Sequence, residues 1–169
     1  MPVLAGDTAT AAQWNLDTLG GTIIARGRRT SNSSTSSSTT PTGVLRLDDI
    51  PLTAGRAYMI MTSSLVLHSS TANDVVRAGI YYTTDGSTPT GSSTLMDFVQ
   101  EAVDITSNPP AQPIVIGYFP AGNETLSVLL AVSRQTGAGN ADLLGASTFP
   151  IDVYVIDRGE DPGSTGTSL

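Results

Sequence analysis

The side chains that could do chemistry are few in this 169-residue chain, and their spacing matches no familiar catalytic motif. His68 is the single histidine, so a site with several histidine metal ligands is excluded, and a nucleophilic triad has one candidate base. No serine lies in the G-x-S-x-G pattern of a nucleophile elbow, and cysteine is absent. Gly137 and Gly139 lack the third glycine of a phosphate-binding loop. We therefore interpret His68 as a surface residue at the end of a strand.

Paired carboxylates are the remaining route to acid–base chemistry, because a glycosidase needs only two of them. Asp48 and Asp49 are neighbours and would point to opposite faces of a strand. Asp97, Glu101 and Asp104 would lie near one face only if their segment were a helix. No Asp-x-Asp-x-Asp loop for calcium is present. Asp152 and Asp157 flank the last expected strand. For each of these carboxylates we expect a solvated surface position, and hence a protein that is not an enzyme and holds no metal or cofactor.

Net charge and hydropathy restrict the classes of partner that the chain could bind. The net charge is −7, the isoelectric point is about 4.3, and Arg28 and Arg29 are the only adjacent cations, so nucleic acid is a poor match. No run of about 18 apolar residues could span a membrane, and the N-terminus lacks the basic and apolar regions of a signal peptide. All 8 basic residues are arginine, which is typical of a GC-rich coding genome.

Alternating apolar residues and frequent turn residues predict an all-β fold after the first 20 residues, with 17 glycines and 10 prolines in the chain. The expected strands cover residues 22–25, 44–52, 56–69, 74–84, 94–105, 113–119, 125–134 and 149–159. The long strand over residues 56–69 could bend at Ser63-Ser64. The segment 94–105 fits a helix and a strand by period, and its strand neighbours favour a strand. About eight strands at this spacing predict an antiparallel β-sandwich of jelly-roll type.

The expected boundaries of the arm, the sandwich and the tail follow from changes in amino-acid composition along the chain. Residues 1–20 form an N-terminal arm in which Asp7 or Thr8 could cap a short helix that ends at Gly20. A helix of about 10 residues is marginal in water, so its apolar side chains must pack on the domain's own core or on a partner. The sandwich is expected over residues 21–159, followed by a polar tail at 160–169.

Within the sandwich, residues 30–43 are rich in serine and threonine and have too little apolar surface to fold by themselves. We expect a long surface loop. A loop without a role and a loop laid over a partner are both open alternatives.

The stretch IYYTTDGSTPTGSST at residues 80–94 resembles a local signature of chitobiase-type C-terminal β-domains, which are Ig-like modules attached to glycoside hydrolases. This resemblance implies carbohydrate binding, for which Tyr81 and Tyr82 are the candidate glycan contacts. Successive residues of a strand alternate between faces, so only one of the two tyrosines can face outward.

A second resemblance involves more of the chain. AGDTATAAQWN, at residues 5–15, resembles the N-terminal segments of bacteriophage virion proteins. The I-x-L-x-A-G-R-x-Y pattern at residues 50–58, the DG-S-T-P-T loop at 85–90 and the V-x-D-x-G pattern at 155–159 are similar to small structural proteins of phages that infect high-GC Gram-positive hosts. The exclusively arginine basic set agrees with such a host.

This resemblance implies a capsid decoration protein, made in the host cytoplasm and located on the capsid surface of the virion. It would bind the major capsid protein as a symmetric homo-oligomer, with a trimer as the first expectation. The assembly contacts would come from apolar residues of the arm, namely Val3, Leu4, Trp14, Leu16 and Leu19. The alternatives are a tail-fibre or baseplate domain that recognises a host surface glycan, and an accessory module of a secreted hydrolase.

Overall fold

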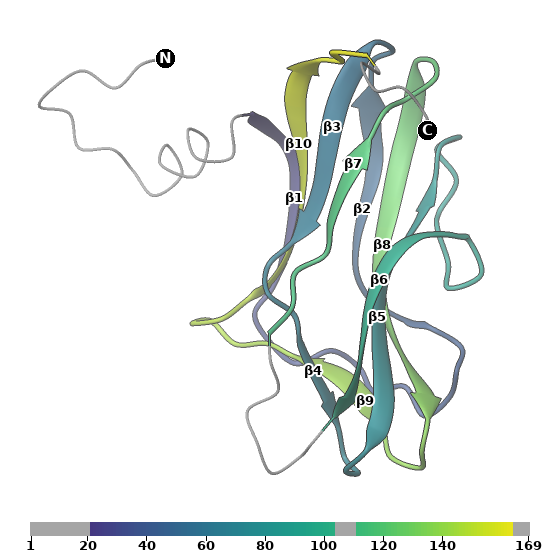
Figure 1. Cartoon of the computed structure of the whole chain (residues 1–169), viewed down its shortest axis with the longest axis vertical. Coiled ribbons are helices and arrows are strands. Elements are labelled where there is room, and N and C mark those ends of the chain that lie inside the picture. Colours follow the sequence, from purple (N-terminus) through teal and green to yellow (C-terminus); the bar gives the residue numbers. More distant parts are fainter. Residues whose placement is uncertain (1–20, 104–110, 164–169) are drawn as a thin grey trace, which may run out of the picture.

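Ten strands, each antiparallel to its neighbours, make up the part of the chain that the computed structural model describes, residues 21–103 and 111–163 (Figure 1). The strands are β1 (Thr22–Arg29), β2 (Thr42–Leu52), β3 (Arg56–Thr62), β4 (Val66–Ser69), β5 (Asp74–Thr83), β6 (Thr94–Val103), β7 (Val115–Tyr118), β8 (Glu124–Thr136), β9 (Ala141–Leu144) and β10 (Ile151–Glu160). The predicted N-terminal helix and arm lie outside the described residues. Within these residues, no helix has the length and hydropathy needed to cross a membrane.

The strands form two four-stranded sheets and one small pair. The first sheet has the order β1-β10-β3-β7, the second has the order β2-β8-β5-β6, and β4 pairs with β9 at one end. In the two large sheets the pairs are nested, because β1 pairs with β10, β2 with β8, β3 with β7 and β5 with β6. A long hairpin rolled up in this way is a jelly roll. The predicted fold class is therefore confirmed, with the two short strands in addition.

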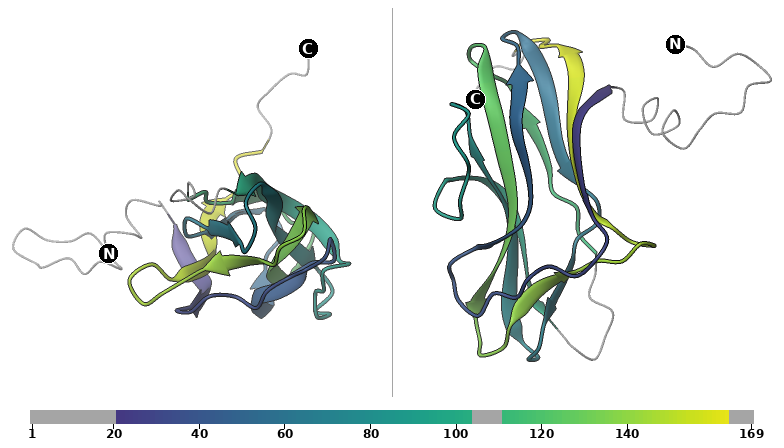
Figure 2. Two further views of the ribbon diagram at one scale, coloured as in Figure 1. Left: turned by 90° about the horizontal axis from the view of Figure 1, so that it is seen from below. Right: turned by 180° about the vertical axis from the view of Figure 1, so that it is seen from behind.

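The core fills the space between the two sheets, which face each other when the molecule is seen from below (Figure 2). Strand β8 is the centre of the second sheet, and all of its residues from Leu126 to Ser133 are buried. Its inward side chains meet Ile60 and Val155 of the first sheet in one apolar cluster. Each fully buried side chain of this size contributes about 1.5–3 kcal/mol, which is how a chain without cysteine can hold the sandwich together.

Two of the expected strands depend on tertiary contacts for their final form. Residues 94–103 form strand β6, as their strand neighbours suggested. The single strand expected over residues 56–69 is instead divided into β3 and β4. The break occurs at Ser63, whose hydroxyl donates to the Pro150 carbonyl and accepts from the Asp152 backbone N–H. These bonds hold the end of β3 to the first sheet, and the chain then moves to the small β4-β9 pair.

The serine- and threonine-rich segment lies along β9 of its own domain. Ser36 forms a two-way backbone bridge with Ala141, and the Ser33 backbone N–H donates to the Leu143 carbonyl. The Ser33 hydroxyl in turn accepts from the Leu143 backbone N–H at 2.9 Å. Both serines are buried, so the hydroxyls of this segment satisfy backbone groups that apolar side chains would leave unpaired.

Candidate functional site

The histidine singled out by the sequence lies in a strand pair. His68 on β4 is directly opposite Asp142 on β9, and its Nδ1 is 2.6 Å from the Asp142 carboxylate. In residues 21–103 and 111–163 no serine or threonine hydroxyl forms a hydrogen bond with this imidazole, and no group of three or more His, Asp or Glu residues could hold a metal ion. The His68–Asp142 pair therefore joins two strands.

The Gly137-Ala138-Gly139 loop does bind an oxyanion, but the oxyanion belongs to its own chain. The buried Asp74 carboxylate accepts from the backbone N–H of Ala138 at 3.0 Å and of Gly139 at 2.7 Å. The Ser69 hydroxyl donates to the same carboxylate at 2.7 Å. The Ser69 hydrogen bond, followed by those from the backbone, holds the Asp74 pKa below its ordinary value. This contact fastens the β8–β9 loop to the start of β5.

The two candidate glycan contacts lie on opposite faces of the second sheet. Tyr81 packs with Leu129 and Ala131 on the outer face, where burial raises its pKa. Tyr82 is half-buried and meets Tyr118 edge to face, with ring centroids 6.0 Å apart. Of the two, Tyr82 is the one that lines a surface hollow.

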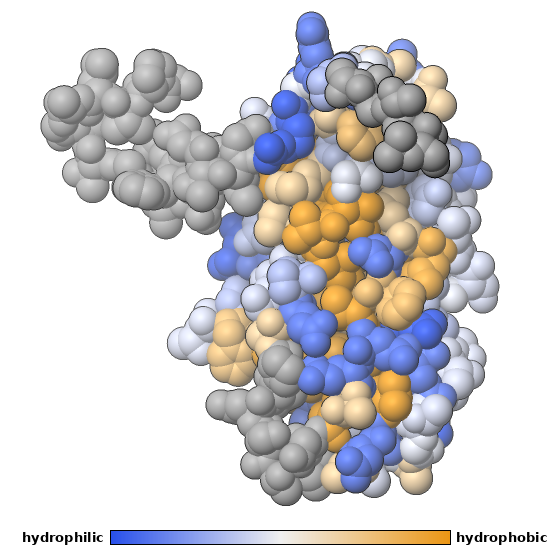
Figure 3. Space-filling model, viewed as in Figure 1, coloured by the Kyte–Doolittle hydropathy of each residue, from blue (hydrophilic) through white to orange (hydrophobic). Residues whose placement is uncertain are grey.

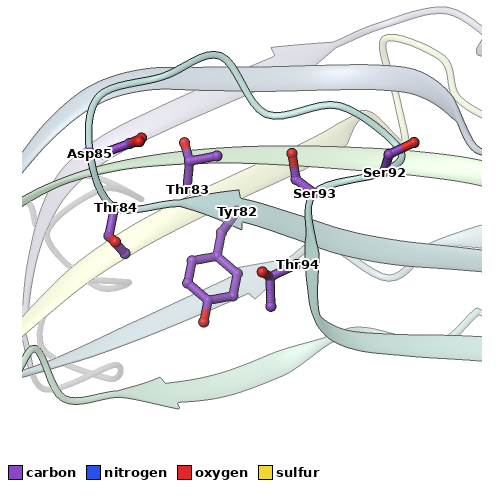
Figure 4. A pocket seen from close by; sticks show the side chains of 7 residues that line it. All are labelled: Tyr82, Thr83, Thr84, Asp85, Ser92, Ser93 and Thr94. Atoms are coloured by element: carbon purple, nitrogen blue, oxygen red, sulfur yellow. The ribbon is translucent and has the colours of Figure 1, made fainter.

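This hollow has a volume of about 380 Å³ and lies where β5 ends and β6 begins (Figure 4). Its lining is almost entirely polar and consists of Tyr82, Thr83, Thr84, Asp85, Ser92, Ser93 and Thr94. Hydrogen bonds from the Ser87 hydroxyl and backbone N–H hold the Asp85 pKa below its ordinary value, so this side chain is a carboxylate at neutral pH. Hydroxyls around one carboxylate and one aromatic ring can donate to and accept from a polyhydroxylated ligand.

A second candidate surface is the outer side of the first sheet. Met59 lies opposite Ile156 and Gly117 in the register, and Met61 lies opposite Tyr154 and Val115. Their chain neighbours point into the core, so these side chains point outward. We call this surface the apolar face, and its members are Ile23, Ile24, Met59, Met61 and Val115. Ile156, which lies opposite Ile23 and Met59 in the register, is fully buried. Ile24 is 39% exposed and Val115 is 52% exposed. The solvated face of an antiparallel sheet is normally polar, so this composition indicates a contact surface.

One end of the apolar face carries a charged cluster. Asp152 is only 3% exposed, so the expectation of a solvated surface carboxylate is wrong for this residue. Its carboxylate accepts from Arg28 at 2.8 and 3.0 Å, from Arg26 at 3.3 Å and from the Tyr154 hydroxyl at 3.0 Å. Burial by itself would raise the Asp152 pKa, but the hydrogen bonds from Arg28 and Tyr154 and the two positive charges outweigh it and lower the pKa. Two guanidinium groups meet one carboxylate, so the cluster has one excess positive charge.

A third surface is the side of the sandwich where β6 and β7 are the edge strands of their sheets and do not pair with each other. Hydrophobic residues gather over and between these two strands (Figure 3). We call this the open side, and its members are Met96, Val99, Ile116 and Tyr118, which are partly buried against the core. Phe98 lies opposite Gly79 in the register and points to the outer face of the second sheet, where it is 42% exposed and the Arg77 guanidinium lies 4.3 Å from its ring centroid. A hydrogen bond from Gln112 to Glu101 crosses from the segment before β7 to β6.

Sequence reasoning missed the apolar face, although a signal for it was present. Residues 58–61 of β3 and 153–156 of β10 are apolar or aromatic at both odd and even positions, whereas a strand with one solvated face alternates. The proposed arm contacts Val3, Leu4, Trp14, Leu16 and Leu19 lie outside the described residues.

Comparison with known proteins gives partial matches. The family model described as "Fn3 associated" matches residues 67–119, about a third of the chain, which includes β5, β6, β7 and the hollow. No curated protein sequence matches. The chain is similar to the solved structure of Eiger TNF from S. frugiperda, with a TM-score of 0.43 and 12% identity over 87% of this chain and 99% of that one.

Two further similarities involve larger proteins. The VP2 subviral particle protein of infectious bursal disease virus has a TM-score of 0.40 and 15% identity, and the match covers 80% of this chain. A component of the Gap123 complex of Streptococcus agalactiae has a TM-score of 0.33 and 14% identity over 73% of this chain. The chain spans 36% of the viral protein and 20% of the streptococcal one.

Proposed function

We propose that this chain is a non-enzymatic structural protein of a bacteriophage virion. In this proposal it decorates the capsid exterior as a symmetric homo-oligomer and binds the major capsid protein. The single observation that supports it most is the apolar face on the outside of the first sheet, because a jelly roll that worked alone would expose polar side chains there. The resemblance to phage virion proteins, in the arm and in the β2–β3 and β10 regions, supplies the virion as the setting.

The binding free energy favours attachment through several copies of a contact over attachment through one. Covering side chains such as Ile24, Met59 and Val115 contributes up to about 1.5–3 kcal/mol each. Association costs on the order of 4–15 kcal/mol in lost freedom, so a single small patch gives weak binding. A closed oligomer presents several copies of its attachment segment at once, and the effective concentration then makes the attachment firm.

The arm is the attachment segment in this proposal. Residue 21, which follows it, lies beside the apolar face, since a Cβ on Gly21 would be 2.8 Å from Ile156 Cγ2. An arm that starts here can carry Trp14, Leu16 and Leu19 to the capsid while the apolar face is used between copies.

The test is binding to capsids that lack this protein. The purified full-length chain should co-sediment with such capsids, and an electron-microscopy map should place it at symmetric positions on the exterior. A chain without residues 2–19 should keep the circular dichroism spectrum of the β-domain and lose binding. Failure of the full-length protein to bind, or undiminished binding by the truncated one, would contradict the decoration role.

The hollow beside Tyr82 favours a second candidate, a tail-fibre or baseplate domain that recognises a host surface glycan. Host cell-wall glycans on an array should then bind the wild type and lose binding on Asp85→Asn and on Ser92→Ala, which alter the lining. Thr88→Ala is the matched control, because Thr88 is an exposed residue of the same loop that does not line the hollow. An array without any bound glycan would reject this candidate.

A further inference from the structure

We infer that the free edge of β6 is a docking site for an extended segment of a partner protein, and that this segment carries two basic side chains four residues apart. The segment would pair with β6 as an added strand of the second sheet, a mode of binding called β-augmentation. The inference goes beyond the decoration role and does not depend on it, because the arm and the β6 edge are different parts of the chain.

The β6 edge is more open to a further strand than the other edges of the two large sheets. Edge strands are normally short, covered, interrupted by proline or protected by charges that point inward. β7 has only four residues, and β1 packs against β2, with Gly27 of β1 close to Leu45 and Leu47 of β2. β6 has ten residues and contains no proline, and among the described residues no strand pairs with its outer edge. Its protection is therefore limited to its charges.

Two carboxylates lie on the inner side of this edge. Asp97 is paired in the register with Ile80, and Glu101 is paired with Val76. Both partners are buried in the core, so both carboxylates lie on the inner face of the second sheet, at its border. In the part of the chain that the structure describes, neither carboxylate forms an ion pair. Val99, a member of the open side, lies between them on the same face.

The hydrogen bonds of these carboxylates leave their charges without a cation. Asp97 accepts from the Phe98 backbone N–H at 2.8 Å, and Glu101 accepts from the Gln112 side chain at 3.2 Å. In a sheet, opposite charges directly across a strand pair are favourable and like charges are unfavourable. A strand with basic residues opposite both carboxylates and an apolar residue between them would therefore pair the charges and cover the open side.

The same charges disfavour pairing with a second β6 or with the arm. Two β6 strands paired antiparallel about Val99 would place Asp97 of each copy opposite Glu101 of the other. The arm, residues 1–20, has two aspartates and no basic side chain, so it is not complementary to this edge. The inward carboxylates thus act against like strands and select a basic one. We therefore assign the partner segment to a different protein.

The outer side of the same edge adds an apolar contact. Phe98 points outward, and Arg77 contacts its ring from the neighbouring strand β5. An added strand would lie on the other side of β6 and cover part of the exposed ring. Successive side chains of a strand alternate between faces, so the partner residue opposite Phe98 points outward while the basic residues point inward. For an antiparallel strand the expected pattern is basic, any residue, apolar, apolar, basic.

The experiment measures binding of a synthetic peptide with this pattern to the full-length chain. The peptide SRTVVRS carries a fluorescent label, and its anisotropy reports the dissociation constant. The edge variant carries Asp97→Asn and Glu101→Gln, which keep the shapes of both side chains and remove their charges. The control variant carries Asp161→Asn and Glu160→Gln, which remove the same charges from two exposed residues outside β6. Thermal unfolding checks that both variants are folded.

The peptide should bind the wild type and the control variant equally. Its affinity for the edge variant should be lower by about 2- to 30-fold, the effect of losing two cross-strand charge pairs. A peptide with both arginines replaced by glutamate should not bind. N-methylation distinguishes strand pairing from charge attraction alone, because only one backbone edge of the added strand faces β6. Methyl groups on one alternate set of residues should abolish binding, and methyl groups on the other set should leave it unchanged.

Three results would overturn the inference: no binding of the peptide, equal affinity for the edge and control variants, or the same effect from both sets of methyl groups. Dissociation of a wild-type oligomer by the peptide, measured by light scattering, would show that a second copy occupies the β6 edge and would overturn it as well. None of these results alters the capsid binding expected of the arm, so the proposed function is tested separately.

Discussion

Replacing Gly139 by alanine is expected to destabilise the fold, because three side-chain oxygens lie close to the position that the new Cβ would take. Its N–H donates to Asp74 Oδ2 at 2.7 Å. A Cβ at this position would lie 2.6 Å from that same oxygen and 2.7 Å from the hydroxyl oxygens of Ser69 and Thr71. The Ser69 and Asp74 oxygens cannot turn away freely, because both residues are buried and hydrogen-bonded to each other. The added methyl group must therefore displace the loop.

Forcing one extra methyl group into a packed site costs about 1–3 kcal/mol. For a chain of this length, each kcal/mol lowers the melting temperature by about 2–4 °C, so Gly139→Ala should lower it by about 2–12 °C. Thermal and urea unfolding followed by circular dichroism measure both quantities. Gly122→Ala is the control, because no atom lies within 4 Å of a Cβ there, and its stability should stay within about 0.5 kcal/mol of the wild type. Equal stability of the two variants would refute the packing argument.

The pH dependence provides an independent check. The Asp74 pKa in the folded protein lies below its ordinary value of 3.8, so the group stabilises the fold at higher pH. That contribution is lost as the pH falls through the lowered folded-state pKa. Gly139→Ala weakens the hydrogen bonds that lower the pKa, so the difference in stability from the wild type should be largest at neutral pH and narrow below pH 3.8. A difference that stays constant with pH would show that the methyl group leaves the Asp74 contacts intact.

Three further changes test other contacts. Tyr118→Phe removes the hydrogen bond that the hydroxyl donates to Glu124, and should lower the unfolding free energy by about 0.5–1.5 kcal/mol. Burial and this bond raise the Tyr118 pKa, so an absorbance titration of the variant should lack the phenol that ionises last in the wild type. Asp152→Asn should cost about 1–3 kcal/mol at neutral pH, measured by urea unfolding, because Arg28 then loses its charged acceptor. Removal of residues 2–19 should change the melting temperature of the β-domain little, whereas a large drop would show that the arm is part of the core.

The fold could be predicted because apolar alternation and turn residues indicate each strand within a short segment of sequence. Alternation identifies the strands even where a second period competes, as in residues 94–103, where the strand interpretation is confirmed. The Asp85-Gly86 pair marks a turn, and Gly86 does adopt a positive φ of 77° there. Such signals act over a few residues, so they are visible without knowledge of the tertiary structure.

The contacts that complete the domain could not be predicted in the same way. Asp74 and Gly139 are 65 residues apart, and no local sequence pattern at either residue predicts their hydrogen bond. Ser33 likewise forms hydrogen bonds with Leu143, 110 residues away in the sequence. These bonds give the polar segment a structural role that its composition does not predict. Long-range hydrogen bonds of this kind depend on the topology, and the topology depends on the whole pattern of pairing.

The jelly-roll topology itself limits where a partner can bind. Nested pairing joins the first and last strands and commits the inner faces of both sheets to the core, so only the outer faces and the edge strands remain available. On the outer face of the second sheet the protein already covers Tyr81 and Leu129. Exposed apolar side chains remain at Ile24 and Val115 on the outer face of the first sheet and at Phe98 on the outer face of the second. The free energy of burying these exposed apolar side chains can be gained only against another molecule, so the outer faces are where a partner is expected to bind.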